Sequence, residues 1–491
     1  MTPEEIGQIY DQGRDAVIAL VRHLFEIIAD LQQQNDLLAE RVSILTERVS
    51  ILESRLSKDS HNSSKPPSSD GLKKPPPKSL RTSSGKSPGG QPGHPGATLC
   101  WSAEPDQVIA HVPDHCVHCG TTLCEAPSSV IERRQVHDLP PLQVVVTEHQ
   151  IHTKVCPVCQ HSTQANFPEG VEAPLQYGPH IHALGVYLTC FQLLPFARSS
   201  ELLHDLFGVS LSEGTLSNAQ TLCSERLTPV RDKIKATLIA ARQAHFDETG
   251  VRIGGRLQWL HLAATPQLTY YAIHPKRGRA ATEAIGILPF FTGRAIHDDW
   301  ATYMTYKCLH GLCNSHHLRQ LLFLAEEEGF LWAQAMKCLL QEMYQAVTQA
   351  QIRGQTSLDP LTLADFECRY QRLIEQGRAA HPAQPPSGKR GQVKQSAGYN
   401  LVKRLDLFRT SVLAFLYDFK APFDNNLAER DIRMMKLRLK ISGGFRTQSG
   451  ADIFCGIRGY LSTMRKQGHN ILRVLKELLS NHIILPMLQP E

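Results

Sequence analysis

Three acidic residues stand in contexts that hydrophobicity alone does not explain. Asp247 (AHFDETG) and Asp298 (AIHDDWATY) each follow a short apolar run, and Glu429 (DNNLAERDIR) opens a basic amphipathic helix. Mg²⁺ prefers oxygen ligands in near-octahedral geometry and keeps waters for a substrate phosphate. Two such ions roughly 4 Å apart can activate an attacking oxygen and stabilise a leaving one. The three carboxylates together therefore predict a two-metal pocket for phosphodiester chemistry.

Each acid taken alone also fits a simpler role. Asp247 and Asp298 could cap turns, and Glu429 could form an ion pair on a helix surface. Two carboxylates at strand ends and one on a helix are the way a ribonuclease-H-like sheet gathers divalent metals. The combination favours the metal pocket, with Mg²⁺ or Mn²⁺ as its two ions.

Cysteines supply a second kind of ligand. Cys116-x-x-Cys119 and Cys156-x-x-Cys159 are two pairs with 36 residues between them. Two such pairs are typical of a tetrahedral, structural Zn²⁺ site. The spare candidates are Cys100, Cys124, His115 and His118. The alternative is unmetallated core cysteines. Residues 130–155 alternate enough to predict a β-hairpin within this zinc-ribbon-like module.

Basic residues cluster around Glu429. Two asparagines precede it, which can cap its helix or touch phosphate, and six cations follow it; the set is Asn425, Asn426, Arg430, Arg433, Lys436, Arg438, Lys440 and Arg446. A solvated helix face is the usual meaning of such a run, but beside a metal-binding acid it favours contacts to the DNA backbone. Cys313, His316 and His317 could form another metal cluster, although their loose spacing favours a structural or DNA-contacting role.

The composition fits a soluble, multidomain protein. The chain has 491 residues, 42% of them hydrophobic and 20% charged, with a net charge of +5. The uncharged stretch 178–197 contains prolines and histidines and indicates a buried helix, not a membrane span. No signal peptide is apparent, so we expect a cytoplasmic protein without membrane attachment. Thirteen cysteines then favour metal ligands and free thiols over disulfides.

The N-terminal segment, residues 1–57, has the pattern of a parallel two-stranded coiled coil. Its heptad positions are Leu24, Leu31, Leu38, Leu45 and Leu52 on one seam, and Ile28, Asn35, Val42, Val49 and Leu56 on the other. Asn35 would fix register and dimer state. The alternative is an amphipathic helix packed on its own chain. Residues 58–98 are rich in Ser, Pro and Gly and predict a basic linker along DNA, or a plain spacer.

Six further segments follow. The zinc-binding module covers 99–175. Residues 176–243 predict helices, with a helix-turn-helix at Gly208 and Ser212 in which Thr215, Ser217, Asn218 and Gln220 could reach base edges. An ordinary helical hairpin is the equal alternative. The catalytic core is expected in 244–321 and 421–450, with an α-helical insertion at 322–420 and a C-terminal helical element at 451–491.

Within the first part of that core, short apolar runs predict five strands. The first is 244–246, ending at Asp247; a hairpin turns at Gly254 and Gly255; a third strand covers 270–273. The fourth, 294–297, delivers Asp298, and the fifth is 309–313. Residues 400–419 predict an apolar helix before the helix of Glu429.

Several long motifs resemble one known family. They are FDETG, D-x-W-x-x-Y (Asp298, Trp300, Tyr303), CNSHHLRQL (313–321), DNNLAER, KISGGFR (440–446), and upstream HNSSKPPSSDG and GGQPGHPGAT. In this order they resemble the DDE transposase of insertion-sequence family 66, from about residue 40 to 485. The resemblance implies that Asp247, Asp298 and Glu429 are the catalytic acids. Asp298 is preferred to Asp299 because Trp300 and Tyr303 then have the family's spacing.

The resemblance implies a function and partners. The enzyme would cut and join DNA at the terminal inverted repeats of a mobile element and at target DNA, as a homodimer or larger assembly, with small element-encoded accessory proteins, in a bacterial, nucleoid-associated setting. The expected fold is multidomain α/β with α-rich parts around a ribonuclease-H-like core. The alternatives are a non-catalytic, zinc-containing DNA-binding regulator, and a nuclease that cleaves without strand transfer.

Overall fold

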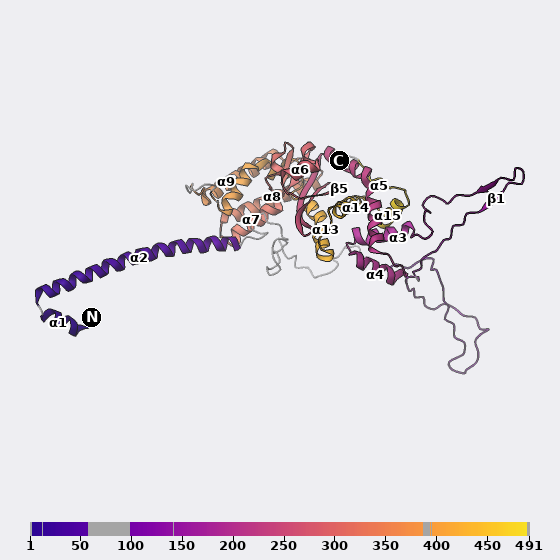
Figure 1. Cartoon of the computed structure of the whole chain (residues 1–491), viewed down its shortest axis with the longest axis horizontal. Coiled ribbons are helices and arrows are strands. Elements are labelled where there is room, and N and C mark those ends of the chain that lie inside the picture. Colours follow the sequence, from indigo (N-terminus) through magenta and orange to yellow (C-terminus); the bar gives the residue numbers. More distant parts are fainter. Residues whose placement is uncertain are drawn as a thin grey trace.

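The computed structural model describes residues 2–11, 13–56, 99–140, 142–385, 393 and 395–488. It is a mixed α/β structure in which helices surround one five-stranded sheet (Figure 1). The predicted linker, 58–98, and part of the stretch within the helical insertion lie outside the described residues.

The sheet has the strand order β5-β4-β3-β6-β7. Its strands are β3 (Gln243–Ile253), β4 (Arg256–Ala264), β5 (Thr269–His274), β6 (Arg294–His297) and β7 (Leu309–Leu312). β3, β4 and β5 form an antiparallel meander, whereas β6 runs parallel to β3 and β7 parallel to β6. The parallel crossover from β5 to β6 contains α6 (Arg279–Ile285) and the short 3₁₀ helix η3 (Leu288–Phe290).

The first strand is longer than predicted. The expected strand end at Asp247 is wrong, because β3 continues without a break to Ile253. Asp, Glu and Gly have weak strand propensity, which is why FDETG predicts an end. In the structure each of them pairs with β4, from Asp247 opposite Leu262 to Gly250 opposite Trp259. Pairing with a neighbouring strand therefore overrides local propensity here. The predicted turn at Gly254 and Gly255 is confirmed, and both glycines have positive φ.

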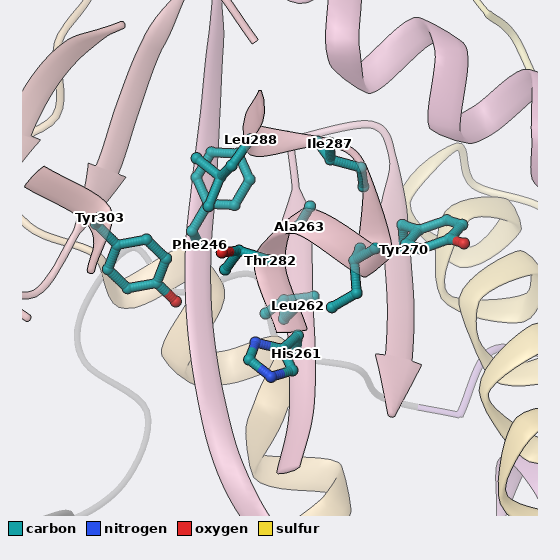
Figure 2. Close-up of a pocket in the computed structure, with 10 residues that line it drawn as sticks. Phe246, His261, Leu262, Ala263, Tyr270, Thr282, Ile287, Leu288 and Tyr303 are labelled. Atoms are coloured by element: carbon teal, nitrogen blue, oxygen red, sulfur yellow. The ribbon is translucent and has the colours of Figure 1, made fainter. Parts of the chain in front are cut away.

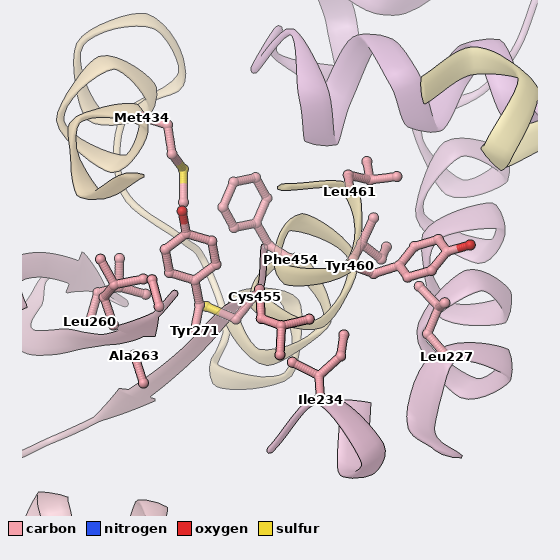
Figure 3. Packing of buried hydrophobic residues seen from close by; sticks show 14 of the residues in the cluster. Leu227, Ile234, Leu260, Ala263, Tyr271, Met434, Phe454, Cys455, Tyr460 and Leu461 are labelled. Carbon is pink, nitrogen blue, oxygen red and sulfur yellow. The ribbon is translucent and has the colours of Figure 1, made fainter. Parts of the chain in front are cut away.

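Three long helices and the shorter α15 share the core of this sheet. They are α5 (Glu213–Ala240), α13 (Asn426–Ser442), α14 (Gln448–Lys466) and α15 (Ile471–Leu479). Figure 3 shows Ile234 of α5, Leu260 of β4 and Tyr271 of β5 converging with Phe454 and Cys455 of α14. Because this core joins segments more than 200 residues apart, the helix of Glu429 is held on the sheet that carries Asp247.

The segment predicted as a helical insertion is helical and has a hydrophobic core of its own. Its helices, with the one that leads into it, are α7 (Asn314–Glu326), α8 (Leu331–Ile352), α9 (Pro360–Ala380), α10 (Ala397–Leu407), α11 (Arg409–Val412) and α12 (Ala414–Tyr417). The single helix predicted over 400–419 is wrong. All five residues from 412 to 416 are buried, and one straight helix would turn some of them toward solvent, so the segment is divided into three.

The predicted helix, glycine turn and serine-capped helix are present, an arrangement common to a helix-turn-helix and to an ordinary helical hairpin. α4 (Phe196–Phe207) ends at Gly208, whose φ of 68° is left-handed, and the Ser212 side chain caps α5 by accepting the N–H of Thr215. A small core that includes Leu203 and Leu216 holds the pair together. The preceding segment forms α3 (Pro179–Val186) and a π-helical turn, η2 (Tyr187–Phe191).

The N-terminal segment is helical, as α1 (Pro3–Asp11) and the 43-residue α2 (Arg14–Leu56), which extends away from the sheet and its helices in Figure 1. Its seam is uncovered: the exposed apolar residues include Leu24, Ile28, Leu31, Leu38, Val42, Leu45 and Val49. The coiled-coil partner remains a prediction.

Residues 99–175 contain two short strands, β1 (Thr153–Val155) and β2 (Ser162–Gln164), paired around the second cysteine pair. The hairpin predicted over 130–155 is wrong: apart from β1, the described residues of that stretch are extended without strand pairing. Among the helices in the described ranges, none is long and apolar enough to cross a membrane.

Candidate metal centre and nucleic-acid interface

The strand register brings Asp247 and Asp298 together. β3 and β6 are parallel, and their last pair is His245 opposite Ile296. Asp247 and Asp298 lie two residues after His245 and Ile296, respectively. Neighbouring strands lie about 5 Å apart, and residues two positions on return to the same side of the sheet. The two carboxylates therefore emerge side by side where β6 ends and β3 continues.

The third acid approaches from α13. Burial raises the pKa of Asp247 well above its ordinary value, and the charges of Glu248, Asp298 and Glu429 raise it further. The charge of Glu429 therefore acts on Asp247. Among the described residues, however, the carboxylates of Asp247, Asp298 and Glu429 do not all lie within 4.8 Å of one another. A cluster of acids that repel one another in this way is suited to a bound cation, which would supply the missing positive charge.

Asn425 fixes the start of α13 against the sheet. Its side chain donates to the carbonyl of Phe246 at 2.8 Å and lies 2.8 Å from Nδ1 of His245, while its backbone N–H donates to Sγ of Cys313 at 3.2 Å. The residue is 2% exposed. The prediction that Asn425 contacts DNA is therefore wrong: its polar groups are used to position Glu429 relative to Asp247.

Asp298 and Asp299 have different environments. Asp298 accepts the backbone N–H of Trp300 at 3.0 Å, and burial, with the charges of Glu248 and Asp299, raises its pKa to about 7. Asp299 instead forms an ion pair with Arg404 of α10. Asp299 thus anchors the helical insertion, which leaves Asp298 as the acid beside Asp247.

Glu248, which no sequence motif singles out, lies beside Asp247 and Asp298. Its side chain is 2% exposed and accepts two hydrogen bonds from Arg277, at 2.9 and 2.6 Å, and one from the hydroxyl of Tyr303. The guanidinium of Arg277 lies between two indoles, 4.9 Å from the ring centre of Trp259 and 4.5 Å from that of Trp300. The D-x-W-x-x-Y motif could have indicated Glu248, because Tyr303 donates to Glu248 and Trp300 contacts Arg277, which also donates to Glu248.

A cluster of mixed ligands borders the acids. Cys313, His316 and Glu429 each offer a ligand atom, and these atoms lie within 4.8 Å of one another. Nε2 of His316 is 3.9 Å from Oε1 of Glu429, and burial lowers the pKa of His316 to about 3. His317 is not part of this cluster, because its ring faces Oδ1 of Asn314 at 3.1 Å.

Cations also surround Glu429. Nη2 of Arg319 lies 3.9 Å from its Oε1, and Nη2 of Arg433 lies 4.0 Å from its Oε2. Burial lowers the pKa of Lys436, while the carboxylates of Asp247 and Glu429 act in the opposite direction. These side chains border the acidic cluster where a DNA phosphate would approach a bound metal.

The predicted DNA-contacting residues differ in exposure. The exposed ones are Asn426, Arg430, Arg433, Lys440 and Arg446. Arg438 is occupied within the fold: its guanidinium lies 3.6 Å from the ring centre of Phe445 and donates to the Gly443 carbonyl at 3.0 Å. Burial lowers the pKa of Arg438 to about 10. The prediction of a DNA contact there is not supported by this packing.

The helix-turn-helix residues divide similarly. Gln220 is buried and donates to the hydroxyl of Thr189 at 2.8 Å, so it cannot reach a base edge. Ser217 and Asn218 are exposed on the second helix. Of these four polar side chains, Ser217 and Asn218 are therefore the exposed ones that DNA could reach.

Each cysteine pair forms the same turn. The N–H of Gly120 donates to the carbonyl of Cys116 at 2.9 Å, and the N–H of Gln160 donates to that of Cys156 at 2.9 Å. Both closing residues have positive φ, 72° and 60°. In the part of the chain that the structure describes, the one group of three ligand atoms within 4.8 Å is that of Cys313, so the two pairs stand apart here. Their zinc ion stays a prediction.

An apolar pocket lies beside the acids. Figure 2 shows Phe246 and Tyr303 on one of its sides, Leu288 and Ile287 above, and His261 below. The pocket is lined mainly by hydrocarbon and contains no carboxylate. It lies between the sheet and α6. A lining without carboxylates is not suited to hold a hard metal ion.

Comparison with protein-family models gives two matches. The model described as the transposase IS66 family matches residues 174–453, a segment that includes all three acids. A family of unknown function, DUF6444, matches residues 12–99. No curated protein matches the chain. Since the first model covers more than half of the sequence, the chain belongs to the IS66 family of transposases.

Proposed function

We propose that this transposase is a DDE-type enzyme that cuts and joins DNA strands at the ends of an insertion sequence, with Asp247, Asp298 and Glu429 as its catalytic acids. The observation that carries the proposal is the β3–β6 register, which sets Asp247 beside Asp298 on the sheet against which α13 packs. The raised pKa of Asp247, caused by burial and by the neighbouring acids, supports a site made for added positive charge.

The sheet supports a ribonuclease-H-like core. An antiparallel meander of three strands continues into two parallel strands in the order β5-β4-β3-β6-β7. Asp247 stands on the central strand, Asp298 follows the next strand, and Glu429 comes from a helix after the insertion. This arrangement supports a shared site for acids that are more than 180 positions apart, although in the described residues the three carboxylates do not all lie within 4.8 Å of one another.

The three acids would hold two Mg²⁺ or Mn²⁺ ions, since all their donors are oxygens. Such ions activate an attacking oxygen and stabilise a leaving one. Water would first attack a phosphodiester at the element end and release a 3′-hydroxyl. That hydroxyl would then attack target DNA in an in-line displacement. No covalent protein–DNA intermediate is needed, so the scheme requires no serine or tyrosine nucleophile.

Other regions would bind and assemble the DNA. The exposed cations Arg430, Arg433, Lys440 and Arg446 would contact the phosphate backbone, and Ser217 and Asn218 would lie nearest to bases. The uncovered seam of α2 would pair two chains and so hold two element ends together. Accessory proteins encoded by the element would complete the assembly.

The zinc-binding module would contribute structure. The matching turns at Cys116 and Cys156 present two thiols each, and a tetrahedral Zn²⁺ would join them. Such an ion would order residues 99–175, where no residue belongs to a hydrophobic core in the described ranges. Chelation should therefore unfold this module and leave the sheet intact.

The experiment that tests the proposal uses labelled DNA carrying an element end, purified full-length protein and Mg²⁺ or Mn²⁺. A transposase gives nicked products and then joined products. The second candidate, a regulator without catalysis, binds the ends and leaves them uncut even with accessory proteins present. Cleavage without joining would indicate a nuclease of another kind.

A further inference from the structure

We propose that Cys313, His316 and Glu429 form a site for one borderline divalent cation of the Zn²⁺ class, and that this site competes with the catalytic pocket for Glu429. A thiolate and an imidazole select Zn²⁺ or Co²⁺ over Mg²⁺, which takes oxygen ligands. The part of the proposal that concerns competition rests on the proposed function; the part that concerns binding does not.

The backbone already presents the first two ligands together. Cys313 is the residue that caps α7, and His316 stands in the first turn of that helix. Residues three apart in a helix share a face. From the sequence, Cys313, His316 and His317 form a loosely spaced group that favours a structural or DNA-contacting role. The structure replaces His317 by Glu429, from a helix more than 100 positions away.

Two of the proposed ligand atoms are close to the separation that Zn²⁺ would require. Tetrahedral Zn²⁺ with nitrogen and oxygen ligands at about 2.0 Å holds those atoms roughly 3.3 Å apart. Nε2 of His316 and Oε1 of Glu429 are 3.9 Å apart in the structure. Closing that gap needs a movement of about 0.6 Å, which side-chain rotation supplies.

Two buried atoms at this place lack hydrogen bonds. Among the described residues, Oε1 of Glu429 and Nδ1 of His316 are buried side-chain atoms with no hydrogen-bond partner. Buried polar atoms are ordinarily paired, so each unpaired one needs an explanation. A metal bound to Oε1 would satisfy the carboxylate directly; held through Nε2 of His316, it would leave Nδ1 of that ring unpaired.

The sulfur atom has a supporting contact. The backbone N–H of Asn425 donates to Sγ of Cys313 at 3.2 Å. An N–H donor stabilises negative charge on sulfur, as partners beyond the ligands do in metal sites. Asn425 thereby links the sulfur ligand to the start of the helix that carries Glu429.

Arg319 competes with a bound cation for the carboxylate of Glu429. Its Nη2 lies 3.9 Å from the same Oε1 atom that would bind the metal, and its Nε donates to the Ser315 carbonyl at 3.2 Å. Without a metal, this guanidinium balances the charge of Glu429. Removing it should strengthen cation binding, whereas removing any ligand should weaken it.

The test is a Co²⁺ titration of the full-length chain with Cys116, Cys119, Cys156 and Cys159 replaced by Ser, followed by absorption spectroscopy. We expect one ion per chain with a thiolate-to-Co²⁺ charge-transfer band, displaced by Zn²⁺. Cys313→Ser should abolish the band. His316→Ala and Glu429→Gln should weaken binding about tenfold or more, and Arg319→Gln should tighten it several-fold.

Two matched controls accompany these variants. Cys308→Ser removes another buried cysteine of the same region, and His317→Asn removes the neighbouring imidazole; both should keep the band. A chain that gives no charge-transfer band, or one whose band survives Cys313→Ser, overturns the proposed site. If Cys313→Ser unfolds, the Glu429→Gln and Arg319→Gln shifts in opposite directions still decide the question.

Competition is measured separately. In the Mg²⁺-dependent nicking assay, low Zn²⁺ should inhibit the parent chain and inhibit Cys313→Ser about tenfold less. Nicking that needs the three acids, in a chain without a Co²⁺ band, would refute the site and leave the proposed function standing. A Co²⁺ band in a chain that never nicks DNA would refute the proposed function and leave the site standing.

Discussion

Tyr303 donates a hydrogen bond from its hydroxyl to Oε2 of Glu248, the residue that follows Asp247 on β3. Tyr303 stands in the short 3₁₀ helix η4 (Tyr303–Thr305), just after Asp298. The bond therefore ties the segment after Asp298 to the strand of Asp247. Both partners are buried, so the distance between Asp247 and Asp298 depends on an interaction that neither of these acids makes.

Tyr303→Phe should destabilise the protein by about 1–3 kcal/mol, because Glu248 would keep a buried, unpaired oxygen. It should also weaken the Mg²⁺ dependence of nicking by loosening the position of Asp298. Urea unfolding and a Mg²⁺ titration measure the two effects. Tyr306→Phe is the matched control, since that half-buried hydroxyl lies near Thr282 and Glu283. Equal effects of the two changes would contradict the role of Tyr303.

The adjacent acids should respond in opposite ways. Asp298→Asn should stabilise the metal-free protein at pH 8 by roughly 4 kcal/mol, because burial and the neighbouring acids raise the pKa of Asp298 from 3.8 to about 7, and should abolish stabilisation by Mg²⁺. Asp299→Asn should destabilise the protein by roughly 3–5 kcal/mol through loss of its pair with Arg404, while Mg²⁺ still stabilises it.

Thermal unfolding with and without Mg²⁺ separates these outcomes. A double-mutant cycle with Arg404→Ala then measures the Asp299 pair itself. If Asp299→Asn removes the response to Mg²⁺ and Asp298→Asn keeps it, the assignment of the second acid must be exchanged.

The sequence predicted the strands of the sheet, the helix-turn-helix and the helical insertion, because apolar runs and turn residues mark them locally. It failed at Asp247, where pairing with β4 extends a strand through residues of weak strand propensity. It could not show that Asn425 is buried or that Arg438 lies on Phe445, since both contacts join distant segments. Glu248 was missed for the same reason: its partners are Arg277 and Tyr303.

Acid should destabilise the fold partly through His261 of β4. Burial lowers the pKa of His261 from 6.5 to about 4, so the folded state holds it neutral where the unfolded state binds a proton. The stability is complete above pH 6.5 and is lost as the pH falls toward 4. His261→Gln should remove roughly 3 kcal/mol of this loss. Unfolding free energies at pH 7 and pH 4.5 measure this loss. The same difference between the two pH values in His261→Gln as in the parent protein would contradict the prediction.

Two arginines of α13 should behave differently. Arg438→Ala should lower stability by about 2 kcal/mol, since a desolvated cation–π contact and its packing are lost. Arg430→Ala, at an exposed position, should leave stability unchanged and reduce the salt slope of DNA binding by about 0.9. Filter binding over a range of salt and urea unfolding test the pair. A loss of DNA affinity confined to Arg438→Ala would reverse the assignment.

The most direct test of the central claim compares four variants in one nicking and strand-joining assay with Mg²⁺: Asp247→Asn, Asp298→Asn, Glu429→Gln and, as the matched control, Asp299→Asn. Each of the first three should lose cleavage by at least about a thousandfold while still binding element-end DNA, because each removes a proposed ligand of the catalytic metals. Asp299→Asn keeps measurable cleavage. Cleavage that persists in any of the three, at the level of the parent protein, would contradict the account.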